Sequence, residues 1–403
     1  MEQGWHPLRA ADPIGGTDIV SPRKRHWRLN DILLQAGLLA FVVAVLSGMA
    51  WNASAALERQ HIASGFGFLN TTAGFDIVQT LVRFDQTSTY GRVLLVGLLN
   101  TLLVAVIGIV IATLLGLIVG IGQLSSNWLV ARLCRAYVET LRNIPLLLQL
   151  FFWYFAVLRA LPVPRDSWAV LDTVFLNNRG LYIPRPIGLP GSELVIGALL
   201  AGVVGCLAIR DWQARHREQT GQHTPIWMAA LGLVIALPLL VSAALGFPVR
   251  FSVPSLAGFD FEGGLVVLPE LMALVVALST YTASYIAEIV RAGIQGVARG
   301  QLESSLALGL TRRQALRLVL VPQALRQIIP PLTSQYLNLT KNSSLAVAIA
   351  YPDLVSVFAG TTLNQTGQAI EIIAITMGVY LGLSLATSAL MNWYNSAIRL
   401  TER

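Results

Sequence analysis

The stretch ESSLALGLTRRQALRLVLVP, from Glu303 to Pro322, is a basic, amphipathic segment within a strongly apolar part of the chain. Gly309 can take the positive φ that ends a short helix, and Thr311 can cap the helix that follows. Apolar residues recur at helical spacing on one side, and arginines keep the other side polar. The segment therefore predicts two short helices folded into a compact knob that fits a groove on a separate protein. An ordinary basic loop between membrane helices is the alternative.

The composition around this segment indicates a polytopic membrane protein. Hydrophobic residues make up 55% of the chain and charged residues 12%, a balance that a soluble core does not explain. A helix needs about 20 apolar residues to cross a bilayer. The candidate spans are 32–51, 93–122, 137–160, 193–209, 226–246, 265–288, 328–350 and 370–391. We therefore expect an all-α fold with about eight transmembrane helices.

Positively charged residues predict the orientation of these helices. If the N-terminus is cytoplasmic, arginines concentrate in the inner segments, with six of them from Arg291 to Arg326, and are sparser in the longer outer loops. By the positive-inside rule, both termini and the 303–322 segment then lie in the cytoplasm. The net charge of +7 follows from this topology and does not predict nucleic-acid binding.

Residue types that carry catalysis or phosphate binding are scarce. The five histidines fall outside the expected spans without metal-ligand spacing, and Cys134 and Cys206 near cytoplasmic ends do not predict a disulfide. Lys24 and Lys341 are the only lysines, and neither follows a glycine, so the sequence has no Gly-x-x-x-x-Gly-Lys-Ser/Thr phosphate loop. We therefore expect neither an enzyme nor a bound cofactor, and an ATPase working with this chain must be another polypeptide.

The 303–322 segment resembles the EAA loop of ABC-importer permeases, in which Glu-Ala-Ala, a glycine and a final proline stand at fixed spacing. Serines replace the two alanines in this chain. The resemblance implies that the loop couples the chain to separate ATPase subunits. The coupling residues that it implies are Glu303, Ser304, Ser305, Gly309 and Pro322.

Further stretches extend the resemblance to about half of the chain. Gly97–Val130 and Tyr137–Phe155 are similar to core helices of polar-amino-acid permeases, as is PQALRQIIPPLTSQYLNLTKNSSLA after the loop. An extra first helix and an insertion between Pro162 and Pro254 resemble the Q-type permease subunit of general L-amino-acid importers, the Aap/Bzt-like systems. The implied domains are a cytoplasmic N-terminal segment (1–31), an extra helix and periplasmic loop (32–92), a first core part (93–160), inserted loops and a helix pair (161–264), and a second core part (265–403) with a coupling loop at 291–327.

The resemblance implies the type I ABC-importer permease fold in a bacterial inner membrane. The implied partners are ATPase subunits that bind ATP, a second permease subunit in a heterodimer, a periplasmic amino-acid-binding protein, membrane lipid and the L-amino acid. The implied mechanism is alternating access, in which closure of the ATPases pushes on the loop and tilts the spans. A secondary amino-acid transporter driven by an ion gradient explains the spans equally well, but it leaves the knob without a role.

Lys341 is the sharpest candidate for a contact with substrate. If its span begins after Pro330 and Pro331, Lys341 lies about 15 Å deep, where an unpaired charge is costly and suggests a transport path. Polar neighbours, Asn342 and Ser344 among them, favour an unwound backbone that faces water. The alternative is a lysine that pairs with a carboxylate or carbonyl and fixes the helix packing.

Two further polar sets leave alternatives open. Thr280, Ser284 and Glu288 recur every four residues and either line the path or allow close helix packing. Glu139 and Arg142 stand three residues apart, which permits an ion pair on one helix face. That pair would anchor its helix near the cytoplasmic end or act as an inner gate.

Overall fold

The computed structural model describes residues 29–59, 65–220 and 227–398. Its internal contacts divide the chain into one unit of residues 1–64 and a second of residues 65–403. Helix α1 (Leu29–Arg59) belongs to the first unit, and its stretch 33–49 is apolar. Nearly all of the predicted N-terminal segment 1–31 lies outside the described residues.

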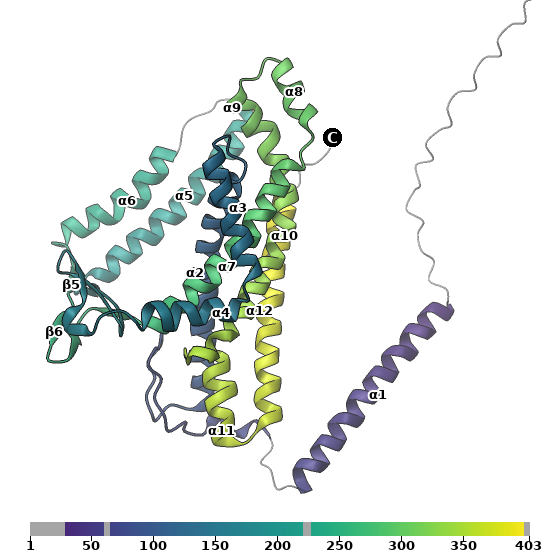
Figure 1. Ribbon diagram of the computed structural model, residues 1–403, viewed down its shortest axis with the longest axis vertical. Coiled ribbons are helices and arrows are strands. Elements are labelled where there is room, and N and C mark those ends of the chain that lie inside the picture. The colour runs from purple at the N-terminus through teal and green to yellow at the C-terminus, as the bar shows by residue number, and fades with distance from the viewer. Residues whose placement is uncertain (1–28, 60–64, 221–226, 399–403) are drawn as a thin grey trace, which may run out of the picture. The chain divides into compact units, whose positions relative to one another are not determined.

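Helices α2 (Tyr90–Gly122) and α7 (Pro269–Gln295) form the centre of the second unit (Figure 1). α2 contains an 18-residue stretch with a mean hydropathy of 3.1, whereas the corresponding stretch of α7 is less apolar and more deeply buried. The two helices approach closely because glycines of α2 face larger residues of α7. A Cβ added at Gly116 would lie 2.6 Å from the Cβ of Ile286. Small residues permit this kind of contact between membrane helices.

Replacing Gly116 with leucine is expected to lower the melting temperature of the detergent-solubilised chain. The added side chain has no room between α2 and α7, and overpacking a filled interface costs about 1–3 kcal/mol. Gly382→Leu is the matched control, because a Cβ at Gly382 would meet no atom within 4 Å. Equal melting temperatures for the two variants would contradict the close contact between α2 and α7.

The predicted span 137–160 is bent rather than straight. Its elements are α3 (Trp128–Asn143), α4 (Leu146–Phe151) and the π-helix η2 (Phe152–Leu158). The helix axis turns by 105° between α3 and the combined α4–η2 segment. Pro145 stands at the N-cap of α4, where its missing N–H removes no helical hydrogen bond. The bend therefore falls at the residue that is best suited to begin a new helix.

The second part of the core also contains a broken span. The broken span consists of α10 (Val321–Asn342) and the 3-10 helix η5 (Ser343–Ile349). The π-helix η6 (Val355–Thr362), α11 (Leu363–Thr366) and the long helix α12 (Ala369–Ile398) follow it. α10 contains Pro330 and Pro331 in its interior, so the helix does not begin after them as expected. The predicted span 328–350 loses its α-helical form after Asn342, and Ala350 is left-handed with a φ of 58°.

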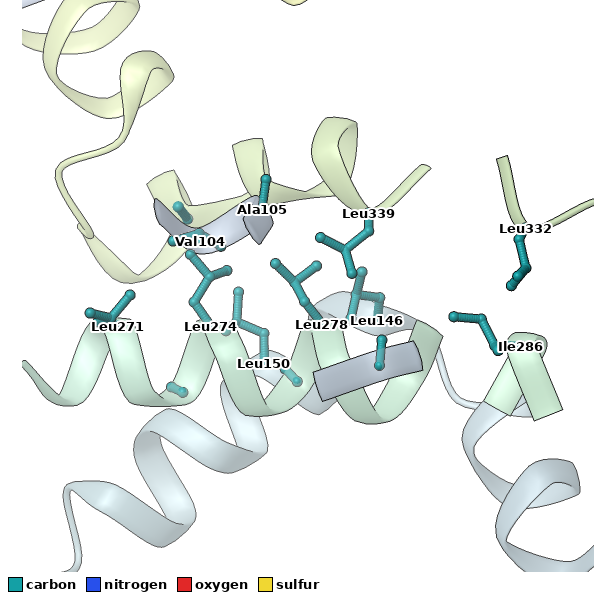
Figure 2. Close-up of a cluster of buried hydrophobic side chains, with 14 of the residues drawn as sticks. Val104, Ala105, Leu146, Leu150, Leu271, Leu274, Leu278, Ile286, Leu332 and Leu339 are labelled. Carbon is teal, nitrogen blue, oxygen red and sulfur yellow. The ribbon is translucent and has the colours of Figure 1, made fainter. Parts of the chain in front are cut away.

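A cluster of buried hydrophobic side chains joins α4, α7 and α10. Figure 2 shows Leu274 and Leu278 of α7 near Leu146 and Leu150 of α4, and Leu339 of α10 near Leu278 and Leu146. All five leucines are buried. This cluster places the last turn of α10, which carries Lys341, beside the first half of α7.

The insertion between the core parts is a helix pair with a small β-structure at its base. Helices α5 (Ser192–Thr220) and α6 (Trp227–Ala244) pack against each other. A four-stranded sheet has the order β1-β2-β3-β8, and two further pairs are β4-β5 and β6-β7. Strands β3 and β8 are antiparallel, with Ile183 opposite Leu265. The chain therefore leaves the core and returns to it at neighbouring positions.

The remaining elements are short. The strands are β1 (Trp168–Val170), β2 (Val174–Asn177), β3 (Gly180–Ile183), β4 (Arg185–Gly188), β5 (Val249–Ser252), β6 (Ser255–Ala257), β7 (Asp260–Glu262) and β8 (Leu265–Val267). The 3-10 helices η1 (Phe66–Asn70) and η3 (Pro164–Asp166) lie in connecting loops. None of these strands was expected, because runs of three or four residues are too short to show a periodic pattern.

Within the described residues, four helices are long and apolar enough to cross a membrane, or five if the bent pair is one span. They are Tyr90–Gly122, Ser192–Ile209, Pro269–Gln295, Ala369–Ser396 and the pair Trp128–Asn143 with Leu146–Leu158. The helical membrane fold expected from composition is confirmed. The predicted spans 32–51, 226–246 and 328–350 do not add to this number. The described apolar stretches of the first two, Leu33–Met49 and Gly232–Ala244, are shorter than a span, and the third is broken.

Candidate functional site

The basic loop, residues 299–320, lies at the opposite end of α7 from the β-structure (Figure 1). It consists of α8 (Arg299–Ala307), α9 (Arg312–Ala315) and the π-helix η4 (Leu316–Leu320). η4 runs directly into α10, and the side chain of Gln323 in α10 donates a hydrogen bond to Gln301 of α8 at 3.4 Å. The loop is thus attached to α10 at two points.

The turn between α8 and α9 has the geometry expected from the sequence. Gly309 has a φ of 82°, in the left-handed region that favours glycine. Thr311 caps α9: its Oγ1 accepts a hydrogen bond from the Gln314 N–H at 3.4 Å, and its own N–H donates to Gln314 Oε1 at 2.9 Å. The two-helix knob predicted from Gly309 and Thr311 is therefore confirmed as a structure.

The other predicted coupling residues occupy different environments in the knob. Glu303 and Ser304 are exposed on α8. Ser305 is buried, and its hydroxyl donates to the Leu302 carbonyl at 2.7 Å. Pro322 is partly buried in the first turn of α10. Glu303 and Ser304 are thus available to a partner, whereas Ser305 is covered and Pro322 is partly covered by the chain itself.

Large apolar side chains are exposed on the basic loop. Leu308, next to the Gly309 turn, is 84% exposed, and Leu318 is 62% exposed. The arginines Arg312 and Arg313 stand beside them on α9 and are also exposed. An exposed apolar patch rimmed by charges is typical of a surface that another protein covers.

Lys341 lies in the last turn of α10, where the α-helix gives way to 3-10 turns. Its side chain is exposed in the single chain, and no carboxylate within the described residues forms a salt bridge with it. Its carbonyl accepts a hydrogen bond from the Ser344 hydroxyl at 2.8 Å, and Asn342 is partly buried beside it. One alternative for Lys341 was a pair with a carboxylate that fixes the helix packing. No such pair is found in the described part of the chain.

Buried polar residues that were not predicted as functional from the sequence stabilise the break after α10. Asn100 of α2 donates to the carbonyls of Pro352 and Gln79 at 2.8 and 2.9 Å. Thr101 accepts from the Leu354 N–H at 3.1 Å. The buried carboxylate of Asp353 accepts from the Ser356 N–H at 2.8 Å, so it caps the start of η6. An aspartate within the apolar run YPDLVSVF was the signal available in the sequence.

The structure does not bring Glu288 and Ser284 to Lys341. Ser279 of α7 donates to the carbonyl of Gly108, and a Cβ at Gly108 would touch Leu339, so Lys341 lies near the level of Ser279. Glu288 is nine residues further along α7, about 13 Å away along the axis. Ser284 is fully buried, with its hydroxyl bonded to the Tyr281 carbonyl at 2.6 Å.

Glu288 belongs instead to a polar cavity between α3 and α7, which we call the loop-end chamber. Its volume is about 720 Å³. Glu288 pairs with Arg291 through two hydrogen bonds from the guanidinium. Arg142 lies over the ring of Tyr285, with its guanidinium carbon 5.0 Å from the ring centroid. The ion pair that the sequence permits between Glu139 and Arg142 is therefore not formed, although both residues line the chamber.

A second cavity, of about 640 Å³, opens at the end of α7 near the β-structure. Three polar side chains meet at its edge. Tyr154 donates a hydrogen bond to Glu270 at 2.7 Å, and Arg159 donates one to the Tyr154 hydroxyl at 2.7 Å. This network ties η2 to the first turn of α7, so the bent segment and the central helix are held together at this cavity.

The β-structure carries its own polar network beside this cavity. Tyr182 donates to Asp260 at 2.8 Å, and Arg179 pairs with the same carboxylate. Burial, followed by this hydrogen bond, raises the pKa of Tyr182 to about 12. Burial acts to raise the pKa of Asp260, but the hydrogen bonds from Tyr182 and the Phe261 N–H outweigh it and lower that pKa. The network joins β3 to β7 across the insertion.

No group of three or more histidine, cysteine, aspartate or glutamate residues that could hold a metal ion occurs in the described ranges. The polar side chains present are arginines, carboxylates, amides and hydroxyls in cavities of small-molecule size. Such an arrangement suits reversible binding of a charged solute.

Comparison with known families gives a match over most of the chain. The model of a family described as binding-protein-dependent transport system inner membrane component matches residues 112–400.

Three curated proteins are similar over nearly their whole length. The general L-amino acid transport system permease protein AapQ of Rhizobium johnstonii is 54% identical, over 90% of this chain and 91% of that protein. The putative amino-acid ABC transporter permease protein YhdX of Escherichia coli K12 is 51% identical, over 96% and 98%. The glutamate/glutamine/aspartate/asparagine transport system permease protein BztB of Rhodobacter capsulatus is 40% identical, over 95% and 99%.

Proposed function

Since this chain belongs to the family of binding-protein-dependent inner membrane transport components, we propose that it is the permease subunit through which polar L-amino acids enter the cell. The chain is a permease subunit of an amino-acid ABC importer, of the Q type, and not an enzyme. The observation that supports the substrate class is the 54% identity to a general L-amino acid permease over 90% of the chain.

The proposed partners are two ATPase subunits, a second permease subunit and a periplasmic amino-acid-binding protein. The exposed leucines and arginines of the basic loop support its role as the ATPase contact, because a free chain gains nothing from exposing Leu308. In this proposal the basic loop lies on the cytoplasmic side, and so do both termini. The β-structure and the cavity next to it then face the binding protein.

The attachment of the basic loop to α10 supports a mechanism for coupling. A movement of α8 and α9 is transmitted to α10 through η4 and through the hydrogen bond between Gln301 and Gln323. The far end of α10 carries Lys341. A movement of the loop can therefore shift the polar break at which Lys341, Asn342 and Ser344 are proposed to contact the amino acid, as alternating access requires.

An uptake assay with purified components tests this proposal. The chain, its partner permease and the ATPase subunits are reconstituted in liposomes with the binding protein outside, and uptake of labelled L-glutamate and L-glutamine is measured. We expect uptake to need enclosed ATP and the binding protein, and to continue when ion gradients are dissipated. Uptake that needs no ATP and follows an imposed ion gradient would support the secondary-transporter alternative instead.

A further inference from the structure

The loop-end chamber is separate from the break that carries Lys341. Glu288, on its wall, lies about 13 Å further along α7 than the level of Lys341. The chamber volume of about 720 Å³ falls within the range of about 300–1,000 Å³ that is usual for small-molecule sites. Apart from Val138, the described residues that line the chamber carry polar or charged groups. Ionisable side chains at a membrane span face water or a solute rather than lipid tails.

Arg142 is the group in the chamber that is best placed to bind an anion. Arg291 is occupied by Glu288, and the Nε of Arg135 donates a hydrogen bond to the Ala131 carbonyl at 3.2 Å. No carboxylate in the described part of the chain forms a salt bridge with Arg142. The guanidinium of Arg142 stacks over the ring of Tyr285. Stacking uses the face of the guanidinium and leaves its N–H donors free at the edge. That edge can bind a carboxylate through two parallel hydrogen bonds.

Glu139 supplies a negative charge next to Arg142. It stands three residues earlier on α3, so the two Cβ atoms lie on one helix face about 5–6 Å apart. Glu139 has no salt bridge within the described ranges either. A free amino acid carries its ammonium and carboxylate groups on a single carbon. The neighbouring charges of Glu139 and Arg142 are complementary to that pair.

We propose that the loop-end chamber is a second amino-acid site, in which Arg142 binds the α-carboxylate and Glu139 binds the α-ammonium group. The site rests on the proposed function and lies on the cytoplasmic side of Lys341. An amino acid released from the break meets it before leaving the membrane, and cytoplasmic amino acid can fill it from the other direction. Its specificity is for the zwitterion and not for the side chain.

Equilibrium binding of labelled L-glutamate tests the second site. The complete importer is placed in phosphatidylcholine nanodiscs without binding protein, with Lys341→Met to remove the first proposed contact. We expect binding to remain in this background. Arg142→Gln is expected to weaken it at least about tenfold, since a charge-assisted hydrogen bond contributes about 1.5–3 kcal/mol. The control Arg132→Gln is expected to leave binding unaffected. Arg132 is an exposed residue of α3 outside the chamber lining.

Two further measurements decide between outcomes. Arg142→Lys keeps the charge but loses the two parallel N–H donors of the guanidinium, so it is expected to bind L-glutamate with intermediate affinity. Co-purified ATPase reports that each variant is folded. Binding unchanged by Arg142→Gln would overturn the proposal, as would loss of amino-acid binding when phosphatidylglycerol is added, because a lipid phosphate would then occupy Arg142. If the wild-type complex shows ATP-dependent uptake in either case, the proposed function stands and only the second site fails.

Discussion

A Gly309→Val variant is expected to lose the ATPase subunits that co-purify with the wild-type chain in detergent. Gly309 has a φ of 82°, and a residue with a Cβ pays about 1–2 kcal/mol to adopt the left-handed region, with β-branched residues the least tolerant. That cost lowers the population of the correct turn by roughly tenfold. Leu308 and Leu318 would then no longer present the same surface to the ATPase.

Gly300→Val is the matched control for this experiment. Gly300 lies in α8 with an ordinary helical backbone, and a Cβ there would meet no atom within 4 Å. The control variant is expected to retain ATPase, and both variants are expected to give the same melting temperature for the membrane core. ATPase retained at the wild-type level by Gly309→Val would show that the turn does not shape the docking surface.

Uptake is expected to fall by roughly 30-fold or more when Lys341 is replaced by methionine, while ATPase co-purification remains unchanged. Lys341 is exposed at the break after α10 and has no carboxylate partner in the described residues. If it pairs with the carboxylate of the amino acid during transport, its removal costs about 2–5 kcal/mol, which sets the size of the effect. Initial uptake rates in proteoliposomes measure the loss.

Two variants at the same place separate charge from local structure. Lys341→Arg keeps the positive charge and is expected to retain part of the uptake. Ser344→Ala removes the hydrogen bond to the Lys341 carbonyl and keeps the charge, so it is expected to have a much smaller effect than Lys341→Met. If Ser344→Ala abolishes uptake and Lys341→Met does not, the Ser344 hydroxyl matters, through the backbone break or through its proposed contact with the amino acid, and the ammonium group does not.

The sequence predicts those parts of the site whose geometry depends only on residues a few positions apart in the chain. Gly309 and Thr311 specify a turn and a cap within a few residues, so the amino-acid sequence alone is enough to predict the knob. The break at Lys341 is predictable in the same way, because Asn342, Ser343 and Ser344 continue a polar run immediately before the apolar residues 345–350. Hydropathy likewise locates α2 and α12, whose apolar composition is continuous.

Contacts between distant residues could not be predicted in this way. The stacking of Arg142 on Tyr285 depends on how α3 and α7 are aligned, and sequence spacing suggested Glu139 as the partner instead. The sequence also suggested that Glu288 and Lys341 line one path. Their different depths in the membrane follow only from contacts between helices, such as that of Ser279 with Gly108. The polar network of Asn100 and Asp353 joins residues about 250 positions apart for the same reason.

The pairing of β3 with β8 has a consequence for how a long permease can arise from a short one. Ile183 lies opposite Leu265, so residues 184–264 leave and rejoin the core at hydrogen-bonded neighbours. A gene segment that encodes such a module can be gained or lost with only a tight turn needed to close the gap. Neither α4 nor α7 then has to move to accommodate the module, whose main tie to β3 is the network of Asp260 with Arg179 and Tyr182.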